Sequence, residues 1–488
     1  MSARRSLLVE RFERVCRDRA SRVALHAPSE YRTVAFDELW RNREVHRRSL
    51  GAAGLAPRSA VVSLVGNRIG LLPFLIAARE LDLVPVPVDA VPTAFELGRL
   101  LRAFEPSAVV APAGAVVATM TEAAPLPDGL ALFRPPPGAG EPVAHAADLF
   151  KLTSGSGGVS KAVACREANL IADGEHIVEA MGIRPDDVNL AAIPLSHSYG
   201  LGNLVMPLLL QGTAAVLRQS FVPDQFLADV AQHAVSVFPG VPFMYDHLLQ
   251  RLDGQRFPAS LRLLMTAGAR IRLETVTGFG RTFGLKVHSF YGTSETGGIA
   301  FDDAAAIDDG LPVGRPLPGT TVTLRAVGPG DGLVHVRGEA VADGYAAGEA
   351  ATDTGFVDGG FLTGDVGHFA GGLLYLTGRR SGFLNVAGRK VDPEEIENVL
   401  LELPEVAAAR VLGIASDTRG EAVVACLVPA PGASIGVAGI REHCSRRLSP
   451  YKIPRRFVVT AALPVGPRGK IDRQALEALA RAPEDDGA

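Results

Sequence analysis

A glycine- and hydroxyl-rich stretch with one lysine, LTSGSGGVSKAV, occupies residues 152–163. Glycine lets a backbone approach a ligand closely and take positive φ angles. Successive backbone N–H groups, hydroxyls and a lysine form a site that attracts anions. The preceding apolar run DLFKL (148–152) is typical of a strand, which argues against a flexible linker. We therefore expect a loop that binds phosphate.

The obvious candidate is the Walker A pattern G-x-x-x-x-G-K-[ST], because Gly155 and Lys161 have its spacing. Ser160, however, stands where the second glycine should be. Ala162 stands where a hydroxyl should bind magnesium. These departures disfavour a P-loop kinase or nucleoside triphosphatase.

Four further segments carry chemically useful residues in a fixed order. They are SFYGTSETGG (289–298), FLTGDVG (361–367), LTGRRSGFLNVAGRKVDPEEIE (376–397) and LPVGPRGKIDR (463–473). With the stretch at 152–163, these motifs make the chain, from about residue 10 to 475, resemble the adenylate-forming superfamily. That superfamily contains acyl- and aryl-CoA synthetases, the adenylation domains of nonribosomal peptide synthetases, and luciferases.

The resemblance implies an enzyme that activates a carboxylic acid with ATP. Such an enzyme makes an acyl-AMP, releases pyrophosphate, and passes the acyl group to a thiol. Two anions must meet in this reaction, so positive charge and shelter from water are needed. The implied cofactors are ATP, Mg²⁺ and coenzyme A, and the implied partner is a small carboxylic acid. A carrier-protein phosphopantetheine arm is an alternative to coenzyme A.

By this resemblance, the opening stretch holds the β- and γ-phosphates of ATP. It departs from the usual TSGTTGxPKG at Gly157, Ser160 and Ala162, so we expect a looser loop with one donor fewer and weakened ATP turnover. The implied donors are Thr153, Ser154, Ser156 and Lys161, and the implied flexible residues are Gly155, Gly157 and Gly158.

The resemblance also assigns roles around the nucleotide. In YGTSE, Tyr291 would stack on adenine, with Gly292 beside it, Ser294 would touch the α-phosphate, and Glu295 would hold Mg²⁺, a metal that prefers oxygen ligands.

Three more segments complete the implied nucleotide site. Gly268 and Ala269 of TAGAR would pass under the adenine. Asp365 would accept both ribose hydroxyls, because a carboxylate accepts two donors at once. Arg379 would approach the ribose and the phosphates.

The last motif implies a mobile C-terminal domain. Lys470 would bridge the acid and the α-phosphate during adenylation, a role that suits a flexible point charge. In a second pose the segment around Gly388 would line the thiol tunnel. The hinge residue would be Ser381, where the family usually has aspartate or lysine, so the balance between the poses is in question.

The implied acyl pocket includes His197 of PLSHSYGLGN, which we also count among the catalytic residues. The stretch FPGVPFM (238–244) has no aspartate to hold an α-amino group, so an amino acid substrate is disfavoured. Phe290 has a large ring where many long-chain enzymes have glycine, which suits a medium-chain or aromatic acid. The predicted pocket residues are His197, Ser198, Phe238, Thr266 and Phe290.

The elements that position these residues follow an α/β pattern. Apolar runs at 60–65, 83–88 and 107–112 alternate with helical stretches, which indicates βαβ units. Short alternating runs from about 320 to 376 predict a β-rich subdomain.

The remaining C-terminal part has the pattern of a small α+β domain. A helix should begin after Asp392, with Pro393 in its first turn and Glu395 completing a capping box. We predict a large N-terminal AMP-binding domain (1–378), a hinge (379–382) and a small domain with the catalytic lysine (383–488).

Composition excludes several other classes. The 488-residue chain is 47% hydrophobic with net charge −4, so a nucleic-acid surface is not expected. Its four cysteines form no CxxC pair, which favours reduced thiols over a zinc or disulfide framework. The most apolar window, 201–217, contains polar and breaking residues and predicts a core segment, not a membrane span. The N-terminus is typical of an amphipathic helix and not of a signal peptide, so we expect a cytoplasmic protein.

Two alternatives to an acyl- or aryl-CoA synthetase stay open. One keeps the fold but changes the acceptor to a carrier protein, or performs only one half-reaction. The irregular phosphate loop and Ser381 motivate it. The other is a catalytically silent nucleotide-binding protein, against which the retained Glu295, Asp365, Arg379 and Lys470 argue.

Overall fold

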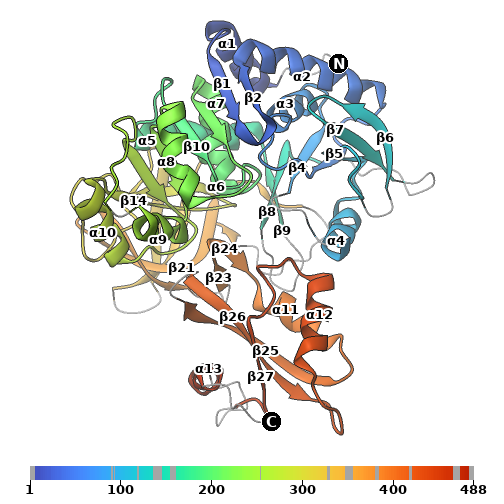
Figure 1. The fold of residues 1–488 in the computed structure, drawn as a ribbon, viewed down its shortest axis with the longest axis vertical. Helices are drawn as coiled ribbons and strands as arrows, with labels where there is room; N and C mark the ends of the chain where they lie inside the picture. The colour runs from blue at the N-terminus through green and yellow to red at the C-terminus, as the bar shows by residue number, and fades with distance from the viewer. Residues whose placement is uncertain are drawn as a thin grey trace. The chain divides into compact units, whose positions relative to one another are not determined.

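The computed structural model divides the chain into two compact units (Figure 1). One contains the described residues of 1–91, 101–153 and 161–381, and the other those of 92–100 and 382–488. The structure describes residues 6–88, 92, 94–117, 120–135, 145–153, 161–252, 254–326, 330–346, 355–379, 384–416, 420–464 and 473–482. The hinge residues 380–382 lie outside these ranges, so the domain boundaries stay a prediction.

The largest sheet of the described chain has nine strands in the order β16-β15-β14-β13-β12-β10-β11-β1-β2. Its central strands are parallel and fully or largely buried, which explains their nearly continuous apolar sequences. Helices connect successive parallel strands, as this geometry requires. The strands are β1 (Val23–Ala27), β2 (Arg32–Ala35), β10 (Val188–Ala191), β11 (Ala214–Leu217), β12 (Val237–Gly240), β13 (Leu263–Thr266), β14 (Val287–Thr293), β15 (Gly297–Phe301) and β16 (Arg315–Pro316).

A second sheet, of five strands among the described residues, has the order β4-β3-β5-β7-β6. The strands predicted at 60–65, 83–88 and 107–112 are confirmed as its β3, β4 and β5, and they pair in parallel. The strands are β3 (Ala60–Ser63), β4 (Val84–Pro87), β5 (Ala108–Pro112), β6 (Thr121–Leu126) and β7 (Leu130–Arg134).

The β-rich subdomain predicted near 320–376 is also confirmed. Five of its strands form a sheet in the described chain, and β19 joins the β8–β9 hairpin in a three-stranded sheet. The strands are β8 (Leu149–Thr153), β9 (Lys161–Cys165), β17 (Thr320–Ala326), β18 (Gly332–Gly338), β19 (Gly344–Tyr345), β20 (Phe356–Val357), β21 (Gly360–Ala370) and β22 (Leu373–Arg379).

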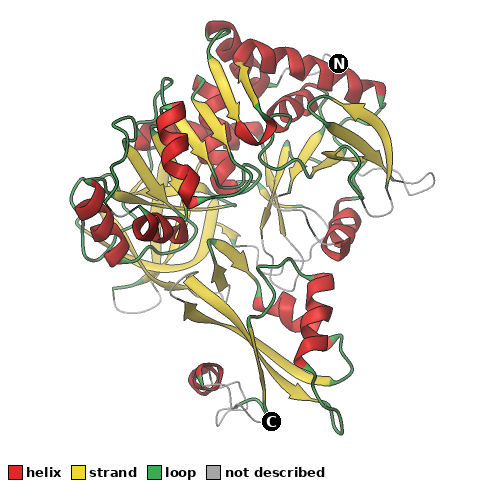
Figure 2. Cartoon of the chain, in the orientation of Figure 1, coloured by secondary structure: helices red, strands yellow, loops and turns green. Residues whose placement is uncertain are grey.

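Helices flank these sheets in the first unit (Figure 2). The long α5 shows how local sequence sets their ends: Asn169 Oδ1 accepts the backbone N–H of Arg166 at 2.8 Å, and Gly182 ends the helix with φ 57°. The helices are α1 (Leu7–Asp18), η1 (Pro28–Glu30), α2 (Phe36–Ala52), α3 (Leu71–Glu80), α5 (Glu167–Met181), α6 (Ser198–Gly200), the π-helix η2 (Leu201–Val205), α7 (Met206–Gln211), α8 (Pro223–His233), α9 (Pro242–Arg251) and α10 (Leu273–Phe283). Helix α4 (Ala94–Phe104) has its first seven residues in the second unit.

The second unit is the predicted small α+β domain, with the strand order β24-β23-β26-β25 and β27 paired to β26 in its described part. Asp392 caps α11 as expected, accepting the N–H of Glu394 at 2.9 Å. A capping box would need the Glu395 side chain to accept the N–H of Asp392. The hydrogen bond that the Glu395 side chain accepts in the structure comes from Lys452 Nζ, at 3.0 Å, so the capping box stays a prediction. The elements are β23 (Leu384–Val386), β24 (Arg389–Val391), α11 (Pro393–Leu401), β25 (Val406–Ser416), β26 (Gly420–Pro429), α12 (Val437–Arg447), β27 (Arg456–Val459) and α13 (Arg473–Arg481).

The core of the first unit lies between these sheets and helices and includes the apolar window at 201–217. Its most buried large side chains are aromatic and aliphatic, such as Phe12, Phe74 and Tyr245. Of the helices in the described ranges, none has the length and apolar character needed to cross a membrane. The predicted fold class, an α/β protein with a large and a small domain, is confirmed.

Candidate active site

Four of the predicted site residues lie where β14 ends and β15 begins. Tyr291 and Gly292 belong to β14, and Ser294 and Glu295 form the turn. A β-carbon at Gly292 would lie 2.6 Å from the carbonyl oxygen of Gly297, so a larger residue would force the two strands apart. The turn therefore fixes the spacing between the tyrosine, the serine and the glutamate.

This turn contacts the segment predicted to border the acyl pocket. Ser198 Oγ donates to Ser294 Oγ at 2.6 Å. His197, directly before α6, is its N-cap, and its Nδ1 accepts the N–H of Tyr199 at 3.5 Å. Ser198 and Ser294, predicted from separate motifs, are thus brought together.

Glu295 contacts a residue that the sequence analysis missed. The side chain of Glu295 is buried, and its Oε1 accepts a hydrogen bond from the Tyr345 hydroxyl at 2.9 Å. The Lys161 ammonium lies 5.1 Å from the centroid of the Tyr345 ring, within the range of a cation–π contact. Tyr345 therefore contacts both the predicted metal-binding carboxylate and the predicted phosphate-binding lysine.

A local signal for Tyr345 was present in the sequence. It is the single large side chain of the stretch ADGYAAG (342–348). Strand β19 brings it to the site, because Tyr345 pairs with Val163 of β9. Its hydrogen bond to a residue 50 positions away has no signature in the sequence.

The predicted phosphate loop joins β8 to β9. Thr153 and Lys161 are register partners at the end of this antiparallel hairpin, and Thr153 Oγ1 donates to the Lys161 carbonyl at 3.5 Å. The loop residues between them lie outside the described residues. The structure therefore gives the two ends of the loop.

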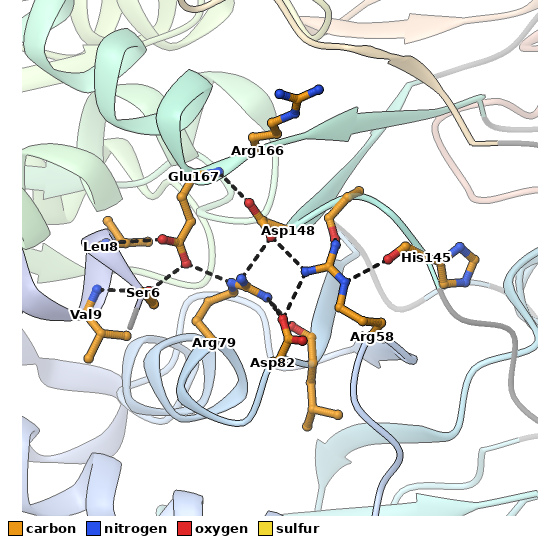
Figure 3. Close-up of polar contacts among 12 residues, drawn as sticks. Ser6, Leu8, Val9, Arg58, Arg79, Asp82, His145, Asp148, Arg166 and Glu167 are labelled. Atoms are coloured by element: carbon orange, nitrogen blue, oxygen red, sulfur yellow. Dashed lines mark hydrogen bonds and ion pairs between the residues drawn. The ribbon is translucent and has the colours of Figure 1, made fainter. Parts of the chain in front are cut away.

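At the other end of the hairpin, a cluster of charged side chains forms hydrogen bonds and ion pairs (Figure 3). Asp148 precedes β8, and its Oδ1 accepts from Arg58 and Arg79, each at 2.9 Å. Glu167 follows β9; its N–H donates to Asp148 Oδ2 at 3.0 Å, and its Oε1 accepts from Arg79 at 2.9 Å and from Ser6 at 2.6 Å. These contacts join the hairpin to the starts of α1 and α5 and to α3.

The same contacts set the acidity of Asp148. Burial acts to raise its pKa, but the N–H of Glu167 and the guanidinium groups of Arg58 and Arg79 outweigh burial and lower the pKa below its ordinary value. The carboxylate is therefore charged at neutral pH.

Asp365, the predicted ribose ligand, lies on β21 and is buried. Its Oδ2 accepts the Tyr291 hydroxyl at 2.7 Å, and Thr363 Oγ1 lies 3.3 Å from the same hydroxyl. Arg379 pairs with Asp365 across β21 and β22. Two predicted nucleotide contacts, Tyr291 and Asp365, are thus adjacent, while the side chain of Arg379 lies outside the described part.

On the acyl side, Phe290 is buried and its ring stacks on Tyr199, with centroids 5.7 Å apart and planes inclined by 29°. The Tyr199 hydroxyl donates to the Met265 carbonyl at 3.3 Å, and burial raises its pKa well above the ordinary value. Tyr199 was also missed, although it stands within the quoted segment PLSHSYGLGN.

Two other predicted pocket residues are deep in the protein. Phe238 is fully buried and contacts the rings of Phe226 and Tyr245. Thr266 ends β13, and its Oγ1 is buried without a hydrogen-bond partner among the described residues. Their assignment to the acyl pocket stays a prediction.

Of the remaining predicted residues, some are described by the structure and some lie outside the described ranges. Gly268, two residues after the end of β13, has φ 83°, which suits glycine, and Ala269 is half-buried beside it. In the second unit, Gly388 has φ 81° and donates its N–H to Asn385 Oδ1 at 3.1 Å. The predicted residues outside the described ranges are Ser154, Gly155, Ser156, Gly157, Gly158, Ser381 and Lys470.

Within the described residues no group of three histidine, cysteine or acidic side chains is arranged to hold a metal ion. Mg²⁺ usually binds through one or two carboxylates plus substrate phosphates, so a lone buried glutamate is the donor it needs. Glu295 fits this requirement: it is a buried carboxylate, and the one side-chain hydrogen bond it has to the described residues is that from Tyr345 to Oε1.

Two known protein families match most of the chain. The family described as AMP-binding enzyme matches residues 12–346. The family described as AMP-binding enzyme C-terminal domain matches residues 395–470.

Individual relatives agree with the family matches. The chain is 33% identical to a sulfoacetate–CoA ligase from Cupriavidus necator over 370 residues, which covers 74% of the chain and 70% of the relative. It is 29% identical to a feruloyl-CoA synthase from Amycolatopsis sp. over 475 residues, which covers 90% and 92%.

A solved structure of o-succinylbenzoate CoA synthetase from Bacillus subtilis, a double mutant, shares the fold. Its TM-score is 0.83 at 24% identity, and the match covers 96% of this chain and 98% of that one. The resemblance carried by the motifs is confirmed. The chain is an enzyme that belongs to the AMP-binding enzyme family, and the relatives it matches are CoA ligases.

Proposed function

We propose that this enzyme activates a carboxylic acid with ATP to an acyl-AMP, releases pyrophosphate, and transfers the acyl group to the thiol of coenzyme A. The relatives described above support this reaction, because their names are those of acid–CoA ligases.

One observation carries the proposal. Ser294, assigned to the α-phosphate, and Ser198, assigned to the acyl pocket, are joined by a hydrogen bond of 2.6 Å. The first reaction joins a carboxylate to an α-phosphate, and holding two reactants side by side removes much of the barrier. A site in which these two binding segments touch suits that step.

The chain's own residues would act as follows. Tyr291 and Asp365 would bind the nucleoside, Ser294 would orient the α-phosphate, and Lys161 would hold the outer phosphates. Lys470 would bring positive charge to the carboxylate and the α-phosphate as they approach, which offsets their repulsion. Mg²⁺ bound at Glu295 would neutralise phosphate charge.

We propose an aromatic acid as the substrate, with a medium-chain fatty acid as the alternative. Phe290 is buried, but Tyr199, on which it stacks, is only half-buried, so the pair would offer a flat apolar surface against which a ring can pack. Apolar and aromatic linings with few polar groups are typical of sites for such ligands.

The test is pyrophosphate release from ATP, measured with and without coenzyme A over a panel of aromatic, medium-chain fatty and small polar acids such as sulfoacetate. We expect release with aromatic acids, and an acyl-CoA product when coenzyme A is present. Release without an acyl-CoA product would favour another acceptor, such as a carrier protein.

Two other outcomes would contradict the proposal. Conversion of supplied acyl-AMP to acyl-CoA without pyrophosphate release would mean that one half-reaction is performed. Nucleotide binding without either reaction would mean a catalytically silent protein.

A further inference from the structure

A buried ion pair joins the strand that precedes the predicted phosphate loop to helix α5. Lys151 is in β8, two residues before Thr153, and Asp173 is in the middle of α5 (Figure 1). Both residues are 3% exposed, and Lys151 Nζ lies 3.8 Å from Asp173 Oδ2. Charged side chains are rarely buried this deeply, because removal from water is costly.

Asp173 also contacts the end of the turn that carries Ser294 and Glu295. Its Oδ1 accepts the N–H of Gly298 at 2.8 Å. A β-carbon at Gly297 would lie 2.3 Å from the same oxygen, so the carboxylate occupies the space that a side chain would need. Gly297 is two residues after Glu295, which means that the carboxylate packs directly against the turn.

The carboxylate contacts a third segment as well. A β-carbon at Gly202, in the π-helix η2, would lie 3.1 Å from Asp173 Oδ2. The π-helix begins directly after α6, which carries Ser198 and Tyr199. Short π-helical stretches inside α-helices are frequent at functional sites.

The negative charge of Asp173 is not needed for its hydrogen bond to Gly298, since a neutral amide would also accept that N–H. What the charge adds is attraction to Lys151. The charges of Lys151 and Asp173 also act on the thiol of Cys165. Burial raises the pKa of this thiol to about 11, so it stays neutral near pH 7. The pair therefore connects β8 to the turn of Ser294 and Glu295.

We propose that Lys151 and Asp173 are positioning residues that hold the strand entering the phosphate loop in register with the turn of Ser294 and Glu295. Side chains at positions i and i+2 of a strand share a face, so Lys151 fixes the face that also carries Thr153. The pair thus aligns the contacts to the outer phosphates with those to the α-phosphate and the metal. This inference rests on the proposed function.

The test compares D173N, K151M and the double variant K151M/D173N. Each keeps nearly the original shape, and D173N keeps an acceptor for Gly298. We expect each single variant to bind MgATP about 2–30-fold more weakly in isothermal titration calorimetry, the range for residues that act on a ligand through other residues. The KM for the acid and thioester formation from supplied acyl-AMP should change far less.

The double variant separates positioning from stability. It leaves no unpaired buried charge, so its melting temperature should return toward the wild-type value while MgATP affinity stays low. D229N is the matched control: Asp229 is also 3% exposed and pairs with Arg218, and neither residue is assigned here to a contact with the nucleotide. It should lower the melting temperature without changing MgATP affinity.

Wild-type MgATP affinity in the folded double variant would overturn the inference. An equal loss of both half-reactions that tracks stability alone would also overturn it. If the wild type binds MgATP but releases no pyrophosphate with any acid, the proposed function fails while the affinity comparison still decides the role of the pair. If the wild type does not bind MgATP, both fail.

Discussion

The Tyr345 hydroxyl offers the sharpest test of the site. Y345F removes one hydrogen bond to the buried carboxylate of Glu295 and keeps the ring that faces Lys161 and Phe356. A hydrogen bond to a charged group contributes about 1.5–3 kcal/mol. Because each 1.4 kcal/mol is a factor of ten, we expect kcat/KM for ATP to fall about 10–100-fold.

The assay is acid-dependent pyrophosphate release at varied MgATP, together with a Mg²⁺ titration. Without its tyrosine partner the Glu295 carboxylate is less firmly oriented, so Y345F should need more Mg²⁺ for half-maximal rate. The melting temperature should change little, because the apolar contacts of the ring remain.

Y375F is the matched control, since the Tyr375 hydroxyl also donates to a carboxylate, Asp308 Oδ2, at 2.8 Å, but at an exposed site. It should leave all kinetic constants unchanged. If Y345F has the wild-type kcat/KM for ATP and the wild-type Mg²⁺ requirement, then Tyr345 does not orient Glu295 for catalysis.

Three further predictions follow from the site and its supports. K470A should abolish pyrophosphate release but spare thioester formation from supplied acyl-AMP; equal loss of both, with the fold intact, would refute the two-pose account. D365N should raise the KM for ATP about tenfold, a change of about 1.4 kcal/mol, because the amide is a weaker acceptor for the ribose and for Tyr291, and a parallel rise in the KM for the acid would contradict this. D148N should lower the free energy of unfolding by about 2 kcal/mol at pH 7, as urea denaturation would show. The folded-state pKa of Asp148 is depressed, so its contribution to the free energy of unfolding is full above the unfolded pKa of about 3.9 and is lost as pH falls through the folded pKa. The free energies of unfolding of wild type and D148N should therefore converge below about pH 4. A difference that stays constant with pH would contradict this prediction.

Much of the fold could be predicted because its signals are local. The strands at 60–65 and 83–88 are short apolar runs rich in valine, and the structure pairs them in parallel. The start of α11 was marked by Asp392 and Pro393, which act within a single turn. Periodicity and capping depend on residues a few positions apart, so they are readable from the chain.

The site was predictable motif by motif, but not as a set of contacts. Tyr291 and Asp365 were each assigned to the nucleotide, yet their hydrogen bond joins residues 74 positions apart. Tyr345 and the pair Lys151–Asp173 were missed, because a tyrosine in a small-residue stretch or a lysine in an apolar strand gains its meaning only from a partner brought close by the fold.

The departures of the phosphate loop from its usual pattern do not all have the same consequence. We expected Ala162, in place of the usual glycine, to contribute to a looser loop. In the structure Ala162 belongs to β9, pairs with Leu152 of β8, and accepts the N–H of Ala346, the residue after β19, at 2.8 Å, so it is held from both sides. Glycine loses more conformational freedom on folding than alanine, at a cost of about 0.5–1 kcal/mol inside a strand. Alanine at this position therefore makes the exit from the loop firmer, and any loosening must come from Gly157 and Ser160, where a donor and a proline ring are replaced.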